Sequence, residues 1–256
     1  MAVLTIAEAL REGIREEMRR DPTVFCIGED IGVTGGWGGA FTVTLGLADE
    51  FGHDRILDTP ISESGFCGVA IGAAMTGMRP IADVQYGDFL FCMMDQLANQ
   101  AAKMTYMSGG TVKVPLVMRA PVGSTRRGAQ HAQTLEVFFT HVPGLKVVAP
   151  STAYDAKGLL KAAVRDDNPV LIFEHKLLYG SKGARSEKGA ISSAGEVPDE
   201  DYIVPIGKGI VRREGRDVTM VGKLLTVYRA MEAAERLAGD GIEAEVIDPR
   251  SLVPLD

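Results

Sequence analysis

A glutamate at the start of a helix-like segment is the side chain best placed for chemistry in this 256-residue sequence. Glu63 lies in residues 58–65, DTPISESG, which follow a strand-like segment and precede a helix-like one. Such a residue lies at the carboxyl end of a parallel strand, where α/β proteins bind ligands. A carboxylate there is also consistent with a purely structural role, because negative charge stabilises the first turn of a helix.

A histidine and a glycine-rich segment are the next candidates. His131 lies in residues 128–133, GAQHAQ, in a long loop that follows a predicted strand. Histidine titrates near neutral pH and can serve as a mobile proton donor, although a solvated loop histidine is the simpler reading. Residues 35–39, GGWGG, form either a surface turn or a mobile active-site loop. Neither a metal-ligand spacing nor a Ser-His-Asp arrangement is found in the sequence.

The remaining glycines do not form a phosphate-binding loop. The glycines from Gly65 to Gly77 fit neither the dinucleotide nor the nucleoside triphosphate motif. Gly68 and Gly72 leave one face of a predicted helix bare, and glycine inside a helix costs up to about 1 kcal/mol relative to alanine. We therefore expect another helix to approach this face closely, for example across a subunit contact.

Composition excludes several classes of protein. The net charge is −7 and the isoelectric point is about 5.2, so a nucleic-acid partner is not expected. The three cysteines stand far apart in apolar runs and indicate reduced thiols rather than a zinc or redox site. Because no apolar run is long enough to span a membrane and no secretory signal is present, we expect a soluble, cytoplasmic protein.

Strand-like and helix-like segments alternate along the chain. Strands are predicted at 24–27, 55–58, 81–84, 115–119, 146–148 and 170–173. Helices are predicted at 6–20, 64–78, 91–106 and 153–165, the first of them with a Thr5/Glu8 capping box. This alternation predicts an α/β fold with a largely parallel sheet flanked by helices.

A change in composition after residue 180 predicts a second domain. Residues 1–180 form the first domain, 181–203 a linker rich in Ser, Gly, Lys and Glu, and 204–256 the start of a smaller α/β domain. The second part contains one strand–helix–strand unit, with strands at 217–221 and 243–247 and a helix at 226–237. A lone unit of this kind leaves a sheet edge open, so we expect this domain to be incomplete or completed by a partner.

Taken together, these segments resemble the β subunit of the E1 component of pyruvate, branched-chain 2-oxo acid and acetoin dehydrogenase complexes, in the transketolase-like superfamily. The resemblance covers nearly the whole chain, and its motifs occur in the family order. They are GED (28–30), DTPISESG (58–65), the segment 85–96, YMSGG (106–110), QHAQ (130–133), PGLKVV (143–148), DNP (167–169) and DPR (248–250). The implied fold is a thiamine-diphosphate pyrimidine-binding domain followed by part of a transketolase C-terminal domain.

The resemblance assigns roles to the candidate residues. Glu63 matches the glutamate that activates thiamine diphosphate by bonding to its pyrimidine ring, with Ile61 as an apolar neighbour. Gln85 and Phe89 match residues that line the pyrimidine, and Glu29 matches a carboxylate placed between the two active sites. Catalysis is then assigned to Glu63 and to His131, which matches a histidine used during transfer to the lipoyl group.

The resemblance also implies ions and partners. A monovalent-cation site, usually for potassium, corresponds to five positions that bind mainly through main-chain oxygens: Leu116, Ala163, Val164, Asp166 and Asn168. An E1 α subunit would hold Mg²⁺ and the diphosphate in an α2β2 heterotetramer with a β–β contact, and a lipoyl-bearing E2 acyltransferase would be the acceptor.

The motifs leave the substrate open. The GGWGG segment is similar to acetoin-type members, whereas residues 85–89, QYGDF, are nearer to branched-chain enzymes. Two other functions also stay open: half of a split transketolase-like enzyme that transfers two-carbon units, and a non-catalytic subunit that keeps the fold.

Overall fold

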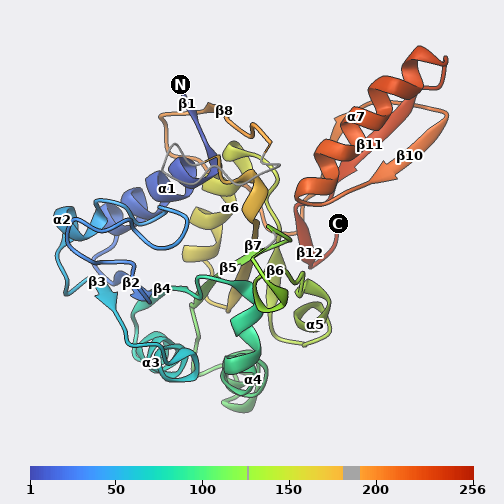
Figure 1. The fold of residues 1–256 in the computed structure, drawn as a ribbon. Helices are drawn as coiled ribbons and strands as arrows, with labels where there is room; N and C mark the ends of the chain where they lie inside the picture. Colours follow the sequence, from blue (N-terminus) through green and yellow to red (C-terminus); the bar gives the residue numbers. More distant parts are fainter. Residues whose placement is uncertain (126, 181–190) are drawn as a thin grey trace.

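The computed structural model describes residues 1–125, 127–180 and 191–256, and Figure 1 shows their arrangement. A short strand, β1 (Ala2–Leu4), leads into helix α1 (Ile6–Arg20). The Thr5 side chain accepts a hydrogen bond from the Glu8 amide, and the Glu8 carboxylate accepts one from the Thr5 backbone. The predicted capping box is therefore confirmed.

Seven strands form the central sheet, in the order β12-β6-β7-β5-β4-β2-β3. Their bounds are β2 Val24–Gly28, β3 Ile56–Asp58, β4 Arg79–Asp83, β5 Val117–Val122, β6 Lys146–Val148, β7 Val170–His175 and β12 Ser251–Val253. Every pairing in this sheet is parallel except that of β12 with β6. The predicted α/β fold with a largely parallel sheet is confirmed.

Helices cover both faces of the sheet (Figure 1). On one face α1 packs against α6 (Ala153–Val164), and on the other lie α3 (Glu63–Met75), α4 (Ala102–Met107) and α5 (Glu136–Thr140). Strand β2 shows why: Val24 and Cys26 belong to the core beneath α1, whereas Phe25 and Ile27 belong to the core beneath α3. Successive strand residues point to opposite faces, so an apolar run of this kind requires cover on both sides.

The predicted helix over 91–106 is partly wrong in type. The segment consists of a 3₁₀ helix, η1 (Gly87–Met93), a π helix, η2 (Gln96–Ala101), and then the short α4. Met93, Leu97 and Ala101 are nevertheless buried in the core that contains α3. The apolar spacing thus encoded which side chains are buried, but not the hydrogen-bond pattern of the backbone.

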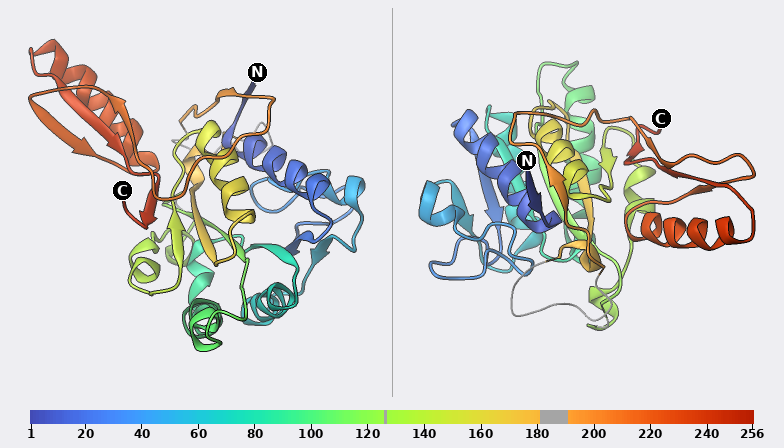
Figure 2. Two further views of the ribbon diagram at one scale, coloured as in Figure 1. Left: turned by 180° about the vertical axis from the view of Figure 1, so that it is seen from behind. Right: turned by 90° about the horizontal axis from the view of Figure 1, so that it is seen from above.

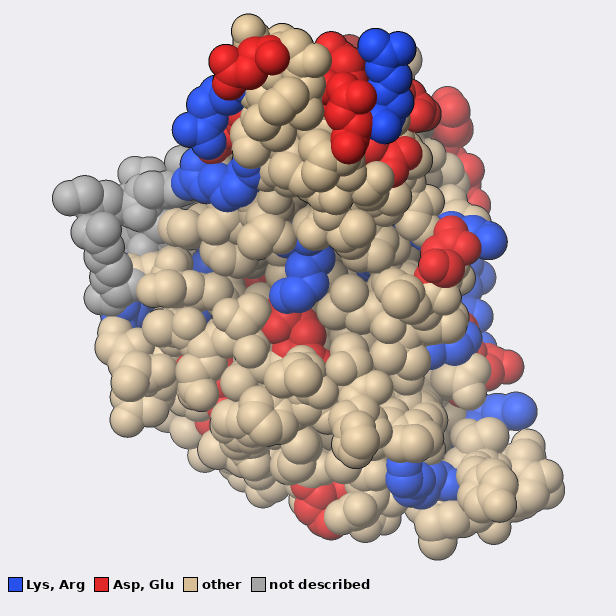
Figure 3. Space-filling model, turned by 90° about the vertical axis from the view of Figure 1, so that its right-hand side faces the viewer, with Lys and Arg blue, Asp and Glu red and all other residues tan. Residues whose placement is uncertain are grey.

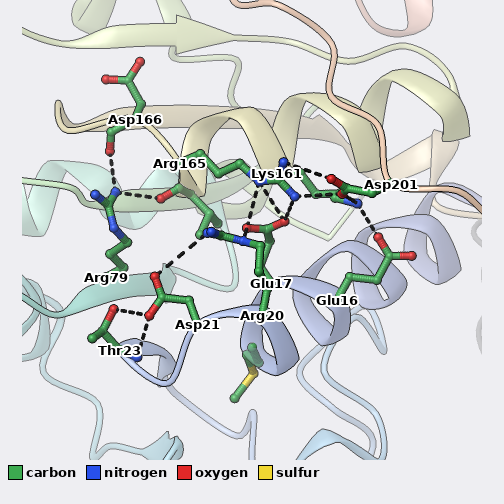
Figure 4. Close-up of polar contacts among 12 residues, drawn as sticks. Glu16, Glu17, Arg20, Asp21, Thr23, Arg79, Lys161, Arg165, Asp166 and Asp201 are labelled. Carbon is green, nitrogen blue, oxygen red and sulfur yellow. Dashed lines mark hydrogen bonds and ion pairs between the residues drawn. The ribbon is translucent and has the colours of Figure 1, made fainter.

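Ordered structure extends into the predicted linker. After the 3₁₀ turn η4 (Lys176–Leu178), strand β8 (Gly195–Val197) pairs antiparallel with β1. Figure 4 shows how the following residues are attached to the first domain. Asp201 forms ion pairs with Lys161 of α6 and with Arg165 directly after it, and these also pair with Glu16 and Glu17 of α1. Arg165 and Lys161 hold the pKa of Asp201 well below its usual range.

The C-terminal part projects from the sheet (Figures 1 and 2). It comprises β9 (Ile210–Arg213), β10 (Val218–Val221), α7 (Leu225–Gly239) and β11 (Ala244–Asp248), with strand order β10-β11-β9. The predicted parallel unit of β10, α7 and β11 is confirmed, and β9 adds an antiparallel strand that was not predicted. Strand β12 then returns to the main sheet. Just before it, buried Arg250 and Asp248 join Arg212 and Asp155 in an ion-pair network.

Candidate active site

A cavity of about 460 Å³ opens at the carboxyl end of the parallel sheet. There β3 and β4 lie on opposite sides of β2, which makes a topological switch point of the kind where α/β sheets bind ligands. Four predicted site residues meet in its wall, namely Glu29, Gln85, Phe89 and His131. The other lining residues are Asp30, Val33, Gly36, Trp37, Gly39, Ala40 and Tyr86.

Two carboxylates lie close together beside this cavity. Glu29 directly follows β2, and Glu63 is the first residue of α3. Burial raises the pKa of Glu29, and the negative charge of Glu63 raises it further, while the Ser62 backbone N–H donates to Glu29 and opposes this. Glu29 Oε1 is buried without a hydrogen bond from any described residue. Glu29 therefore offers a buried acceptor oxygen near a second carboxylate.

The segment before Glu63 is fixed to the end of β2. The Thr59 backbone N–H donates to the Gly28 carbonyl at 3.0 Å, and the Gly32 amide donates to Asp58 Oδ1 at 2.8 Å. Ile61 is 84% exposed, and neither Ile61 nor Glu63 lines the cavity. The structure thus leaves Ile61 at the surface beside the site.

The Gln85 side chain links two of the segments that line the cavity. Its side chain donates from Nε2 to the Glu29 carbonyl at 2.6 Å and accepts at Oε1 from the Ala40 amide at 2.7 Å. Its own φ is +62°, an uncommon conformation for a residue other than glycine. Asp83 Oδ1 accepts from the Gln85 backbone N–H at 2.9 Å and supports this conformation. Gln85 therefore shapes the cavity wall through both ends of its amide.

A buried ion-pair network lies directly beneath Gln85. The Arg119 side chain is 1% exposed and donates to Asp83 at 2.5 Å and to Glu174 at 2.6 and 2.9 Å. The Tyr179 hydroxyl donates to the same Glu174 carboxylate. Burial raises the pKa of Glu174, and the charge and hydrogen bonds of Arg119 oppose this rise. The network joins the ends of β4, β5 and β7 below the site.

Aromatic rings form the apolar part of the wall. The His131 ring meets the Tyr86 ring edge-on at a centroid distance of 4.5 Å and the Phe89 ring at 5.4 Å. The sequence pointed to Phe89 and His131 and left the loop that carries Trp37 open between a surface turn and an active-site loop. Tyr86 was missed as a lining residue. The signal for Trp37 was present, since it is the only tryptophan and lies in a glycine-rich loop. Tyr86 had no comparable signal.

The five predicted cation-site positions lie in two segments, Leu116 directly before β5 and the other four at the end of α6 and just after it. The Val170 amide donates to the Leu116 carbonyl, and the Asp166 amide to the Ala163 carbonyl. Arg79 donates to the carbonyls of Val164 and Asp166 at 2.9 and 3.1 Å (Figure 4).

Within this region the Asp166 carboxylate is engaged by protein donors. Lys146 and Asn168 bond to it and hold its pKa below the usual range despite burial. The Arg79 guanidinium already donates to two of the oxygens assigned to the cation, the carbonyls of Val164 and Asp166. Cation binding stays a prediction.

No group of three or more His, Cys, Asp or Glu side chains in the described part of the chain is arranged to hold a metal ion. Among the described helices, none has the length and apolar content needed to cross a membrane.

Two family models match the chain. The transketolase pyrimidine-binding domain matches residues 2–182, and the transketolase C-terminal domain matches residues 207–256.

Curated relatives cover the whole chain at high identity. The 2-oxoisovalerate dehydrogenase subunit beta of Bacillus subtilis is 49% identical, over 100% of this chain and 74% of the relative. The acetoin:2,6-dichlorophenolindophenol oxidoreductase subunit beta of Cupriavidus necator is 50% identical, over 99% and 73%. The pyruvate dehydrogenase E1 component subunit beta of Rhizobium meliloti is 46% identical, over 100% and 53%.

Solved structures at lower identity share the fold. A split-gene transketolase, described as an inactive β4 tetramer, has a TM-score of 0.73 at 22% identity and covers 100% of this chain and 74% of its own. Transketolase from Leishmania mexicana has a TM-score of 0.73 at 14% identity, covering 98% and 35%.

Proposed function

We propose that this chain works with an α subunit in a reaction of the thiamine diphosphate-dependent 2-oxo acid dehydrogenases. The reason is that the chain belongs to the family of β subunits of these enzymes. The reaction is oxidative decarboxylation of a 2-oxo acid, or cleavage of acetoin, followed by reductive acylation of the lipoyl group of an E2 acyltransferase. The observation that carries the proposal is the Glu29–Glu63 pair beside a cavity lined by Gln85, Phe89 and His131.

The residues present fit the pyrimidine end of the cofactor. Thiamine diphosphate supplies, when bound, the nucleophilic carbon that attacks the substrate carbonyl. Glu63 would bond to the pyrimidine nitrogen, with Glu29 as a neighbouring carboxylate. Phe89 and Tyr86 offer an apolar wall for a planar ring. His131 would donate a proton to the reacting substrate.

The diphosphate and Mg²⁺ would be held by the α subunit. The exposed apolar side chains of this chain support such a partner. Val137 and Phe138 of α5 are 67% and 47% exposed, and Tyr106 and Met107 of α4 are 88% and 73% exposed. Figure 3 views the side with α5 and the C-terminal part, and its lower half carries few charged residues. Large apolar patches of this kind mark protein contacts.

A β–β contact in an α2β2 heterotetramer is supported by α3. Apart from the chain neighbours and backbone of α3 itself, no atom of the described residues lies within 4 Å of a Cβ built on Gly68 or Gly72, and Val69 between them is 58% exposed. The close helix approach expected from these glycines is therefore not made within the described part of this chain. We propose that a second subunit makes it.

A split transketolase-like activity is the alternative. Its support is the fold shared with the split-gene transketolase, at 22% identity, whereas the dehydrogenase subunits are 46–50% identical. We therefore favour the dehydrogenase. The three relatives named differ in substrate, so the acyl group has to be determined by experiment.

The test is the assembled enzyme. The chain is combined with its α subunit, thiamine diphosphate and Mg²⁺, and reduction of dichlorophenolindophenol is followed with pyruvate, 2-oxoisovalerate or acetoin. Activity with one of them is expected. Glu63→Gln should lower this activity by about 10²–10⁴-fold, the usual contribution of a positioned acid or base. Glu235→Gln, which changes an exposed glutamate of α7, should not.

Two outcomes would contradict the proposal. If the wild-type complex reduces no dye with any of the three substrates but transfers two-carbon units between sugar phosphates, the alternative function is correct. If Glu63→Gln assembles normally by gel filtration and keeps near-normal activity, Glu63 does not activate the cofactor.

A further inference from the structure

The loop that carries His131 is closed at its base by a backbone hydrogen bond. It leaves the sheet at Gly123, directly after β5, and includes the 3₁₀ turn η3 (Ala129–His131). The Gly123 amide donates to the Gln133 carbonyl at 3.1 Å. The Asp88 carboxylate accepts hydrogen bonds from the Gln133 backbone and side chain at 3.2 and 2.9 Å. These contacts fix where the loop begins and ends, but not where the His131 residue itself lies.

Strand β7 ends beneath this loop and supports its first residue. Gly123 has φ +90°, and a Cβ there would lie 2.2 Å from His175 Nε2, so the His175 ring packs directly on the glycine. His175 Nδ1 accepts from the Leu177 amide and begins the turn that directs Lys176. Burial, with the nearby charges of Lys176 and Lys223, lowers the pKa of His175 to about 4. The ring is therefore a neutral, rigid support at neutral pH.

The next residue of the chain holds His131. The Lys176 residue is 2% exposed, and its Nζ donates to the His131 carbonyl oxygen at 2.7 Å. The same Nζ lies 5.0 Å from the centre of the Tyr86 ring, a cation–π distance. The Tyr86 ring also contacts the His131 ring, at a centroid distance of 4.5 Å. Lys176 thus acts on both the backbone of His131 and the aromatic ring against which its imidazole packs.

We infer that Lys176 is a positioning residue for His131: it holds the imidazole against the cavity from the rigid end of β7. The inference rests on the proposed function for its catalytic consequence, but not for the structural coupling itself. A loop histidine can deliver a proton only when it stays within hydrogen-bond reach of the reacting group. A donor in the turn directly after buried strand β7 gives the loop this constraint, since a hydrogen bond from a charged donor is stronger than a neutral one.

The structural coupling can be measured without any activity. Amide hydrogen exchange of residues 128–133 is compared in the full chain for the wild type, Lys176→Met and Lys176→Arg. Methionine has a similar length but cannot donate, and arginine keeps the charge and the donors. Exchange in Lys176→Met should be at least about tenfold faster, as expected for loss of a charge-assisted hydrogen bond, and Lys176→Arg should restore slow exchange. Lys208→Met, which removes an exposed lysine paired with Asp256, is the control.

The catalytic consequence is measured on the complex with the α subunit, thiamine diphosphate and Mg²⁺. Lys176→Met should lower kcat for reductive acylation of a lipoyl domain by about tenfold or more. The KM for the 2-oxo acid should change by less than about twofold, because the substitution leaves binding of the substrate in the ground state unchanged. Lys176→Arg should recover most of kcat. A residue needed only for folding would not give this split between kcat and KM with rescue by arginine.

Each result decides one question. Unchanged exchange in Lys176→Met would overturn the inference. Faster exchange together with the kcat loss supports it. Faster exchange with normal acylation overturns the catalytic consequence. If Lys176→Met shows faster exchange with normal acylation and His131→Ala is also fully active, the proposed role of His131 is wrong. The structural coupling between Lys176 and His131 is then still supported.

Discussion

Removing the buried guanidinium of Arg119 is the sharpest test of what holds the site in place. In Arg119→Met, two carboxylates of the network, Asp83 and Glu174, lose hydrogen bonds of 2.5–2.9 Å in a region that solvent barely reaches. The aliphatic length of the side chain is largely kept, so lost packing contributes little. The effect measured is therefore mainly that of leaving negative charges buried without their partner.

The structure sets the size of the effect. Breaking a buried pair by removal of one partner destabilises a protein by about 3–5 kcal/mol. For a chain of this length that corresponds to a fall in Tm of roughly 6–20 °C. Arg229→Met is the matched control, because Arg229 pairs with Glu232 while both side chains are about half exposed, at 54% and 52%. An exposed pair is worth about 0–1 kcal/mol, so the control should shift Tm by no more than a few degrees.

Lowering the pH should narrow the difference in Tm between Arg119→Met and the wild type. The pKa of Glu174 is already raised by burial in the wild type, and Arg119 is the main influence that lowers it. Without Arg119 the folded-state pKa rises further above the unfolded value, so the folded protein binds the proton more tightly. The contribution of Glu174 to stability is then fully present below the unfolded pKa and is lost as pH rises through the folded pKa. Arg119→Met should therefore be least stable at neutral pH and recover on acidification.

Thermal unfolding followed by circular dichroism at several pH values measures both effects. A loss in Arg119→Met no larger than in Arg229→Met would show that the network contributes no more than a surface pair. A Tm difference from the wild type that stays constant with pH would refute the role assigned to Glu174.

Two further predictions concern the walls and the support of the cavity. Gly38→Ala should cost about 1–3 kcal/mol and shift the fluorescence of Trp37, because φ is +68° and a Cβ would lie 2.0 Å from the Leu45 nitrogen. Gly35→Ala has a similar φ of +66° but open space, so thermal unfolding should show a smaller loss. For His175, the folded-state pKa of about 4 is lower than the ordinary 6.5, so the folded protein binds fewer protons than the unfolded one between these values. Stability should fall as pH falls through this range, and His175→Gln should remove part of that slope in pH-dependent unfolding; an identical slope in both proteins would contradict the assignment.

The sequence by itself determined the layered α/β fold. The apolar run of residues 24–27 requires cover on both faces of a sheet, and the capping box at Thr5 places the start of the first helix within one residue. These signals are local: side-chain alternation and a cap depend on neighbours a few residues away, so they can be read along the chain. The resemblance to the family also pointed to Glu29, Gln85, Phe89 and His131, and all four line one cavity.

Only the tertiary structure decided how those residues are held. Lys176 meets His131 from 45 positions away, and Arg119 meets Glu174 from 55 positions away. The tertiary structure also decided that β12 joins the main sheet and that the 91–106 segment changes its helix type. The physical reason is common to these cases. A buried charge must be paired, and a strand must hydrogen-bond to a neighbouring strand. The sequence indicates that a partner is required, but only the folded chain decides which residue or strand is the partner.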